Sequence, residues 1–178
     1  WSWGEEGNNL RLGWSLEREC WPAPLTQAPW NERLPVIRAS GDQLGQISKR
    51  RAKQLGLPSD VQIIAGTTDS NAAVLATDPG DDDGITVLGT TLVMKRFTTV
   101  PIRGPGITCH RVGGRWLCGG SSNAGAGVLR QFFSDELLSE LSRQINPDIN
   151  SGLAFRPLPR PGERFPVDDP SLMPILEP

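Results

Sequence analysis

The chain has 178 residues, a length typical of one domain or of two small ones. Its 18 lysines and arginines nearly balance its 20 aspartates and glutamates, and a formal net charge of −2 lacks the basic surplus that broad binding of nucleic acid or of an anionic membrane requires. No apolar run approaches the roughly 18 residues of a membrane span, and no charged-then-apolar leader opens the sequence. We expect a soluble protein with neither nucleic acid nor membrane as its partner.

The three cysteines, Cys20, Cys109 and Cys118, cannot all pair within the chain, and none forms a C-x-x-C motif. We expect reduced thiols in a cytoplasmic protein, because the cytosol keeps thiols reduced. Cys109, His110 and Cys118 lack the usual spacing of metal ligands, so we expect no metal site there.

Residues 1–41 are rich in proline and tryptophan. Because proline is excluded from helix interiors, we expect an extended segment whose tryptophans cover another surface. The residues that carry this interpretation are Trp14, Trp21-Pro22-Ala23-Pro24, Pro29-Trp30 and Pro35.

Regular structure is expected from Gly45 onward. Ser48 is a plausible helix N-cap, and Gly56 followed by Pro58 ends that helix. The short branched run at 61–65, Val-Gln-Ile-Ile-Ala, predicts a buried strand.

A tight turn, Gly66-Thr67-Thr68-Asp69, follows this strand and leads into a predicted helix of small residues over 70–76. A carboxylate at a strand-to-helix turn faces the crevice where α/β proteins bind ligands. The helix N-terminus favours its ionised form, so Asp69 could accept a proton from a substrate hydroxyl. The alternative is that Asp69 is only a helix cap.

The Pro-, Gly- and Asp-rich segment 78–84 predicts a solvated turn, because it lacks the ladder of a calcium loop. Two strands are predicted at 85–88 and 91–97. The turn between them, Gly89-Thr90-Thr91, offers backbone amides and hydroxyls that could bind an anion such as phosphate. An ordinary turn is the alternative, and the sequence of a P-loop is absent.

Strands at 107–112 and 115–118 are predicted to form a hairpin around Gly113-Gly114. The glycine-rich run from Gly119 through Gly125 then leads into a helix predicted at 128–133. Small residues there would let nucleotide phosphates approach the backbone, and the alternative is close helix packing.

Ser134 is expected to cap a last helix, and the segment from Pro147 contains half of the 16 prolines and cannot form regular structure. The apolar face expected for that helix consists of Leu137, Leu138, Leu141 and Ile145. Both ends look cut, so the chain resembles a piece of a larger α/β protein.

Three segments in this order resemble the FGGY carbohydrate kinases, the family of xylulokinase, ribulokinase and glycerol kinase. They are Ile63-Ile64-Ala65-Gly66-Thr67-Thr68-Asp69-Ser70-Asn71-Ala72-Ala73, Ile85-Thr86-Val87-Leu88-Gly89-Thr90-Thr91-Leu92-Val93-Met94-Lys95 and Gly119-Gly120-Ser121-Ser122-Asn123-Ala124-Gly125. Two further segments resemble the small D-ribulokinase or xylulokinase-like branch, Asn8-Asn9-Leu10-Arg11-Leu12-Gly13-Trp14 and Pro157-Leu158-Pro159-Arg160-Pro161-Gly162-Glu163-Arg164-Phe165-Pro166.

The resemblance implies part of a two-lobed, actin-like (ribonuclease H-like) α/β fold. Residues 1–83 would end the sugar-binding lobe, and residues 84–178 would begin the ATP-binding lobe. It also implies an ATP-dependent kinase that uses Mg²⁺ and phosphorylates a ketopentose, D-ribulose or D-xylulose.

The resemblance further implies a role for each candidate residue. Asp69 would be the base that deprotonates the sugar hydroxyl, and Ser70 would lie at the sugar. Gly89, Thr90 and Thr91 would hold the ATP phosphates, with Gly125 against the nucleotide.

Two parts of the family pattern are absent: the N-terminal D-x-G-T phosphate loop and the downstream loop that binds adenosine. Glu5-Glu6-Gly7-Asn8-Asn9 stands where relatives have an aspartate directly before asparagines. We therefore expect little or no activity from this chain alone, and the alternative function is a truncated, non-catalytic remnant of such a kinase. An actin-like ATPase or filament subunit would share the fold but not these motifs.

Overall fold

A computed structural model describes residues 2–176, which divide into two compact units. The first runs to Gly80 and includes Thr98–Val100 and His110–Leu117, and the second comprises Asp81–Phe97, Pro101–Cys109 and the chain from Cys118 onward. The assignment of residues 1–83 and 84–178 to a sugar lobe and an ATP lobe stays a prediction. Among the described residues, no helix has the length and apolar character to cross a membrane.

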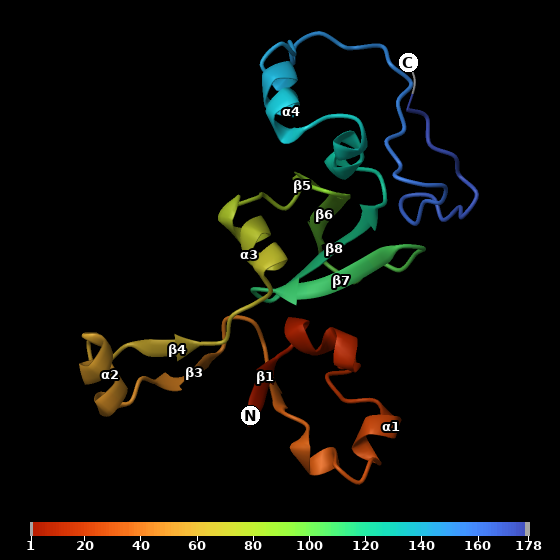
Figure 1. Cartoon of the computed structure of the whole chain (residues 1–178). Helices are drawn as coiled ribbons and strands as arrows, with labels where there is room; N and C mark the ends of the chain where they lie inside the picture. The colour runs from red at the N-terminus through yellow and green to blue at the C-terminus, as the bar shows by residue number, and fades with distance from the viewer. Residues whose placement is uncertain (1, 177–178) are drawn as a thin grey trace. The chain divides into compact units, whose positions relative to one another are not determined.

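Short elements occupy the proline- and tryptophan-rich start of the first unit (Figure 1). They are β1 (Trp3–Glu5), η1 (Gly7–Leu12), α1 (Ala23–Thr26), η2 (Asn31–Arg33) and β2 (Val36–Arg38). The expectation of one extended segment is corrected, because β1 and β2 pair in parallel, with Trp3 opposite Val36. Trp14 and Trp21 meet edge to face at 5.2 Å between ring centroids, so these rings cover their own segment.

A two-stranded antiparallel sheet, β3 (Gln43–Gln46) and β4 (Gln62–Ile64), is joined by α2 (Lys49–Leu55). The helix limits are confirmed: the Ser48 side chain accepts the Arg51 amide, and Gly56 ends the helix with a left-handed φ of 68°. The strand β4 is where the sequence predicts it, but its predicted burial is wrong. Ile64 is 51% exposed, because β4 belongs to a sheet of only two strands.

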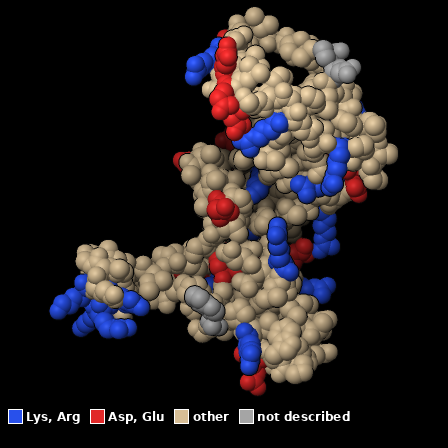
Figure 2. All heavy atoms as spheres, viewed as in Figure 1, with Lys and Arg blue, Asp and Glu red and all other residues tan. Residues whose placement is uncertain are grey.

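The basic side chains of α2 gather on one surface, as Figure 2 shows. They are Lys49, Arg50, Arg51 and Lys53. After β4, the chain passes through the turn at Gly66 into α3 (Asp69–Ala76). Asn71 and Val74 of this helix are buried.

A four-stranded sheet with strand order β5-β6-β8-β7 follows α3 along the chain (green in Figure 1). Its strands are β5 (Gly84–Leu88), β6 (Leu92–Thr98), β7 (Ile107–Val112) and β8 (Arg115–Ser122). Both predicted hairpins are confirmed, with β5 and β6 antiparallel and Leu88 opposite Leu92. Gly113 and Gly114 have φ values of 57° and 77°, the positive values that a two-residue type I′ turn requires.

The glycine-rich run after the hairpin differs from its prediction. Strand β8 continues through Ser122, and the predicted helix is a 3-10 helix, η3 (Ala126–Gln131). A side chain at Gly119 would collide with the Met94 carbonyl, so glycine here permits close contact with β6.

Helix α4 (Asp135–Ser142) begins where predicted, and the Ser134 hydroxyl accepts the Leu137 amide at 3.3 Å. Its predicted apolar face is partly wrong: Leu137 is exposed, and Ile145 lies beyond the helix. Only Leu138 and Leu141 are half-buried.

The proline-rich tail contains no helix or strand within its described residues, as predicted. It is held by isolated bridges, Arg156 with Ile175 and Glu163 with Asp169. Leu158 is fully buried, so the tail contributes to the core.

The expectation of three reduced thiols is wrong, because Cys109 and Cys118 form a disulfide and only Cys20 is free. A two-residue turn at Gly113-Gly114 places these positions directly opposite one another, with 4.2 Å between their Cα atoms. The predicted hairpin register therefore indicated the Cys109–Cys118 pair, which the number of cysteines alone did not.

Candidate functional site

Asp69 is the first residue of α3 and is exposed. Thr68 is the N-cap and makes no side-chain capping bond, so the helix starts one residue earlier than predicted and Asp69 is not its cap. One Asp69 carboxylate oxygen accepts the Ser70 amide at 2.7 Å. The carboxylate lies in the first turn, where the helix dipole favours its negative charge, and it is accessible to a ligand.

The turn around Asp69 contains a residue that the sequence did not single out. The Thr67 side-chain oxygen is buried and has no hydrogen-bond partner among the described residues. The neighbouring Ser70 hydroxyl is exposed and lies 3.4 Å from the hydroxyl of Thr68. The first unit thus presents a carboxylate and hydroxyls on one turn.

The Gly89–Thr91 turn joins β5 to β6 in the second unit. Gly89 and Thr90 are exposed and Thr91 is half-buried. Within the turn, the Gly89 amide donates to the Thr91 carbonyl at 3.1 Å, which closes it tightly.

The segment 124–127 is bound along this turn by backbone hydrogen bonds. The Ala124 carbonyl accepts the Leu92 amide at 2.6 Å, and the amides of Ala126 and Gly127 donate to the carbonyls of Gly89 and Thr90 at 2.9 and 3.3 Å. The structure therefore brings together four of the predicted residues, Gly89, Thr90, Thr91 and Gly125.

Gly125 is buried and would not tolerate a side chain. A Cβ atom built there would lie 2.5 Å from the Thr90 carbonyl oxygen and 2.6 Å from Thr91 Cα. Its φ of 167° is extended backbone, so glycine is required by this close approach and not by its conformation. Gly125 is thus in close packing contact with the turn, as the alternative interpretation of this glycine-rich run expects.

A carboxylate that the sequence reasoning missed, Glu163, lies beside these glycines. It is buried and accepts hydrogen bonds from the Ser122 hydroxyl and from the Asn123 and Arg164 amides at 2.5, 2.7 and 2.8 Å. Burial by itself would raise the pKa of Glu163, but the hydrogen bonds from Ser122, Asn123, Arg164 and Phe165 outweigh it and hold the pKa below the ordinary value of 4.5. No signal in the sequence distinguished Glu163 from the other charged residues of the tail, because its burial is visible only in the structure.

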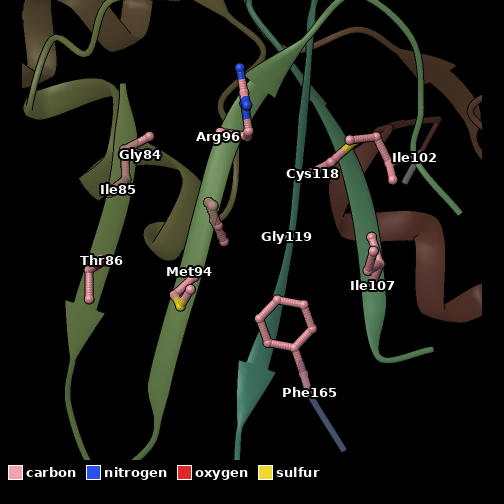
Figure 3. A pocket seen from close by; sticks show the side chains of 11 residues that line it. Gly84, Ile85, Thr86, Met94, Arg96, Ile102, Ile107, Cys118, Gly119 and Phe165 are labelled. Atoms are coloured by element: carbon pink, nitrogen blue, oxygen red, sulfur yellow. The ribbon is translucent and has the colours of Figure 1, made fainter. Parts of the chain in front are cut away.

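An apolar cavity of about 320 Å³ lies on the sheet of the second unit. The Phe165 ring lies over β8, between Met94 of β6 and Ile107 of β7 (Figure 3). Lys95 also lines it, and burial lowers the pKa of its ammonium group. The sequence did not predict this cavity.

The asparagine segment of the first unit, Asn8 and Asn9, is used in local bonding. The Glu5 carboxylate accepts the backbone amide of Asn8 at 2.9 Å and its side-chain amide at 2.7 Å. Glu6 is buried and forms an ion pair with Arg111 at 2.7 Å. These contacts hold the 3-10 helix η1 in place.

A magnesium ion is implied by the family resemblance. In residues 2–176, no group of three or more His, Cys, Asp or Glu side chains could hold a metal ion. We therefore derive no step through a magnesium ion held by the protein alone.

The two units have the actin-like, ribonuclease H-like fold of the FGGY sugar kinases over part of its length. The resemblance inferred from the three motifs is thereby confirmed at the level of fold. No family model matches the chain.

Three solved kinases carry this likeness. A xylulose kinase from Lactobacillus acidophilus superposes with a TM-score of 0.66 and 22% identity, over 93% of this chain and 36% of the kinase. A xylulose kinase from Rhodospirillum rubrum superposes with a TM-score of 0.65 and 18% identity, over 82% of this chain and 33% of the kinase. A gluconate kinase from L. acidophilus superposes with a TM-score of 0.61 and 20% identity, over 80% of this chain and 32% of the kinase.

One curated relative is similar in sequence. "Putative sugar kinase YoaC" of Bacillus subtilis (strain 168) is 34% identical over 87 residues, which are 47% of this chain and 18% of that protein. The chain thus spans about a third of the solved kinases and a smaller part of this relative.

Proposed function

We propose that this chain is part of an ATP-dependent carbohydrate kinase that transfers the γ-phosphate of ATP to a hydroxyl of a ketopentose, D-ribulose or D-xylulose. The single observation that carries the proposal is the pairing of the exposed Gly89–Thr91 turn with the buried Gly125 in a sugar-kinase fold. Two of the structural neighbours are xylulose kinases, which supports a ketopentose, whereas the third is a gluconate kinase.

Asp69 is the proposed base and Ser70 a proposed sugar contact. The Asp69 carboxylate would take the proton of the acceptor hydroxyl while that oxygen attacks the γ-phosphorus and ADP leaves. Its exposure on the first turn of α3 supports this role, because a general base must reach the substrate.

The Gly89–Thr91 turn is the proposed phosphate site, and Gly125 is proposed to lie against the nucleotide. Phosphoryl transfer depends mainly on positioning the phosphates and neutralising their charge with hydrogen-bond donors. Threonine hydroxyls on a tight exposed turn suit that task, and Mg²⁺ would arrive bound to the ATP phosphates.

The proposal assigns residues 1–83 to the sugar-binding lobe and residues 84–178 to the ATP-binding lobe. It also assumes a cytoplasmic location. The alternative function is a truncated, non-catalytic remnant of such a kinase.

The test is MgATP-dependent ADP release with D-ribulose, D-xylulose or gluconate. It is run on the purified chain and on the chain joined to an N-terminal segment that carries D-x-G-T and to a downstream segment that carries the adenosine-binding loop. We expect little release from the chain alone, and ketopentose-dependent release from the joined protein that Asp69→Ala abolishes.

Two results would oppose the proposal. Activity with gluconate alone would overturn the ketopentose. No release with any sugar from a folded joined protein would support the remnant.

A further inference from the structure

We propose that Glu163 is a positioning residue for the phosphate turn: its carboxylate fixes the backbone of Asn123 and Ala124, and that backbone fixes the Gly89–Thr91 turn. This inference rests on the proposed function, because it adds a residue to the same phosphate site. All the contacts that carry it lie within the second unit.

The first step is the set of bonds at the carboxylate. One Glu163 oxygen accepts the Ser122 hydroxyl, and the other accepts the Asn123 amide at 2.7 Å and the Arg164 amide at 2.8 Å. The Phe165 amide adds a longer bond of 3.3 Å to that second oxygen. All four partners donate, so the site is built for a group that only accepts, which is a carboxylate.

The second step leads from Ser122 to Ala124. The Ser122 oxygen accepts the Ala124 amide at 2.9 Å while its hydroxyl donates to Glu163. A hydroxyl has one proton, so its donation to Glu163 leaves its lone pairs for Ala124. The carboxylate therefore orients the group that holds Ala124.

The third step leads from Ala124 to the turn. The Ala124 carbonyl accepts the amide of Leu92, the residue that directly follows Thr91, at 2.6 Å. Ala126 and Gly127 then donate to Gly89 and Thr90. Because segment 124–127 is bonded on both sides of the turn, a displacement of Ala124 displaces the proposed phosphate donors as well.

The tail itself is fastened to the same strand, which keeps Glu163 in register. The Asn123 side chain donates to the Gly162 carbonyl at 3.0 Å, and the Arg164 guanidinium donates to the Ser121 carbonyl at 2.7 Å. A side chain at Gly120 would collide with the Phe165 ring. Glu163 thus acts from a tail that contains no helix or strand within its described residues.

The experiment compares four proteins: the wild type, Glu163→Gln, Ser122→Ala and the control Glu140→Gln. Glutamine keeps the shape of Glu163, but with its oxygen at the three backbone amides it places an NH₂ group where the Ser122 hydroxyl needs an acceptor. Ser122→Ala removes the link to Ala124 and leaves the carboxylate. Glu140 is an exposed residue of α4, so its substitution tests the loss of a charge alone.

Calorimetric titration with MgATP and with magnesium tripolyphosphate measures affinity for phosphates. We expect at least tenfold weaker binding of both probes by Glu163→Gln, a smaller loss in Ser122→Ala and no change in Glu140→Gln. Equal losses for the two probes place the effect at the phosphates, since tripolyphosphate lacks adenosine.

Amide hydrogen exchange of the same proteins separates a local displacement of the segment beside the turn from a general loss of structure. We expect faster exchange at Asn123, Ala124 and Leu92 in Glu163→Gln, with Val87 in β5 unchanged. If Glu163→Gln does not fold, Ser122→Ala carries the test.

The failures are distinguishable. A wild type that binds neither probe overturns the phosphate site and this inference with it. A wild type that binds both, with folded Glu163→Gln or Ser122→Ala binding equally well, overturns only the role of Glu163.

Discussion

The carboxylate of Glu163 accepts the backbone amide of Asn123 at 2.7 Å, although 40 positions separate the two residues in sequence. This bond attaches the proline-rich tail to the end of β8, next to the glycine that contacts Thr90. Two segments that look independent in sequence therefore form one structural element, and stability and proposed phosphate binding should depend on it together.

The first prediction concerns the pH dependence of that attachment. The pKa of Glu163 is held below 4.5 in the folded chain, so its stabilisation is complete above the pKa of the unfolded chain and is lost as pH falls through the folded value. Urea unfolding at several pH values should show wild type more stable than Glu163→Gln at pH 7, with the gap closing below about pH 4. A gap that persists unchanged at pH 2.5 would contradict the assignment.

The second prediction is that Gly125→Ala destabilises the second unit by about 1–3 kcal/mol, because the new methyl group overlaps the Thr90 carbonyl. Thermal and urea unfolding measure the change. Gly84→Ala is the matched control, since nothing lies within 4 Å of a Cβ atom there. Equal stability of the two variants would mean that the turn moves freely away from Gly125.

The third prediction concerns the proposed base. Asp69→Asn should lower sugar-dependent ADP release of the joined protein by about 10²-fold or more, because an amide cannot take the hydroxyl proton. Thermal stability should stay nearly the same, since Asp69 is exposed. Asp82→Asn, an exposed acid in the turn between α3 and β5, serves as the control. Full activity of Asp69→Asn would remove Asp69 from catalysis.

The fourth prediction concerns the cysteines. Titration with a thiol reagent under native, non-reducing conditions should count one thiol, Cys20, and three after reduction and unfolding. Because the disulfide closes a short loop, reduction should lower the free energy of unfolding by about 2–3 kcal/mol. Cys109→Ser should lose that difference between oxidised and reduced protein, and Cys20→Ser should keep it.

Local signals predicted local elements well. The Ser48 hydroxyl and Gly56 bracket α2 as expected, and Gly113-Gly114 turns β7 into β8. Capping and two-residue turns depend on residues within four positions of each other, so the sequence contains all the information they need. The candidate residues at Gly89–Thr91 and at Gly125 were found in the same way, from turns and glycine runs.

Burial was predicted less well. The apolar composition of β4 suggested a core strand, yet Ile63 and Ile64 are exposed. An apolar composition makes burial of a strand favourable, but whether the strand is buried depends on which other elements pack against it. The parallel pairing of β1 with β2, across more than thirty residues, was missed for the same reason.

The sequence by itself determined the two hairpin turns, the ends of α2, the start of α4, the resemblance to sugar kinases and the residue types offered to a substrate. Only the tertiary structure decided that Gly125 packs on Thr90 and that Glu163 holds Asn123. The physical reason is range: a cap or a turn is stabilised by its own neighbours, whereas these contacts join residues whose meeting depends on how the whole sheet and tail fold.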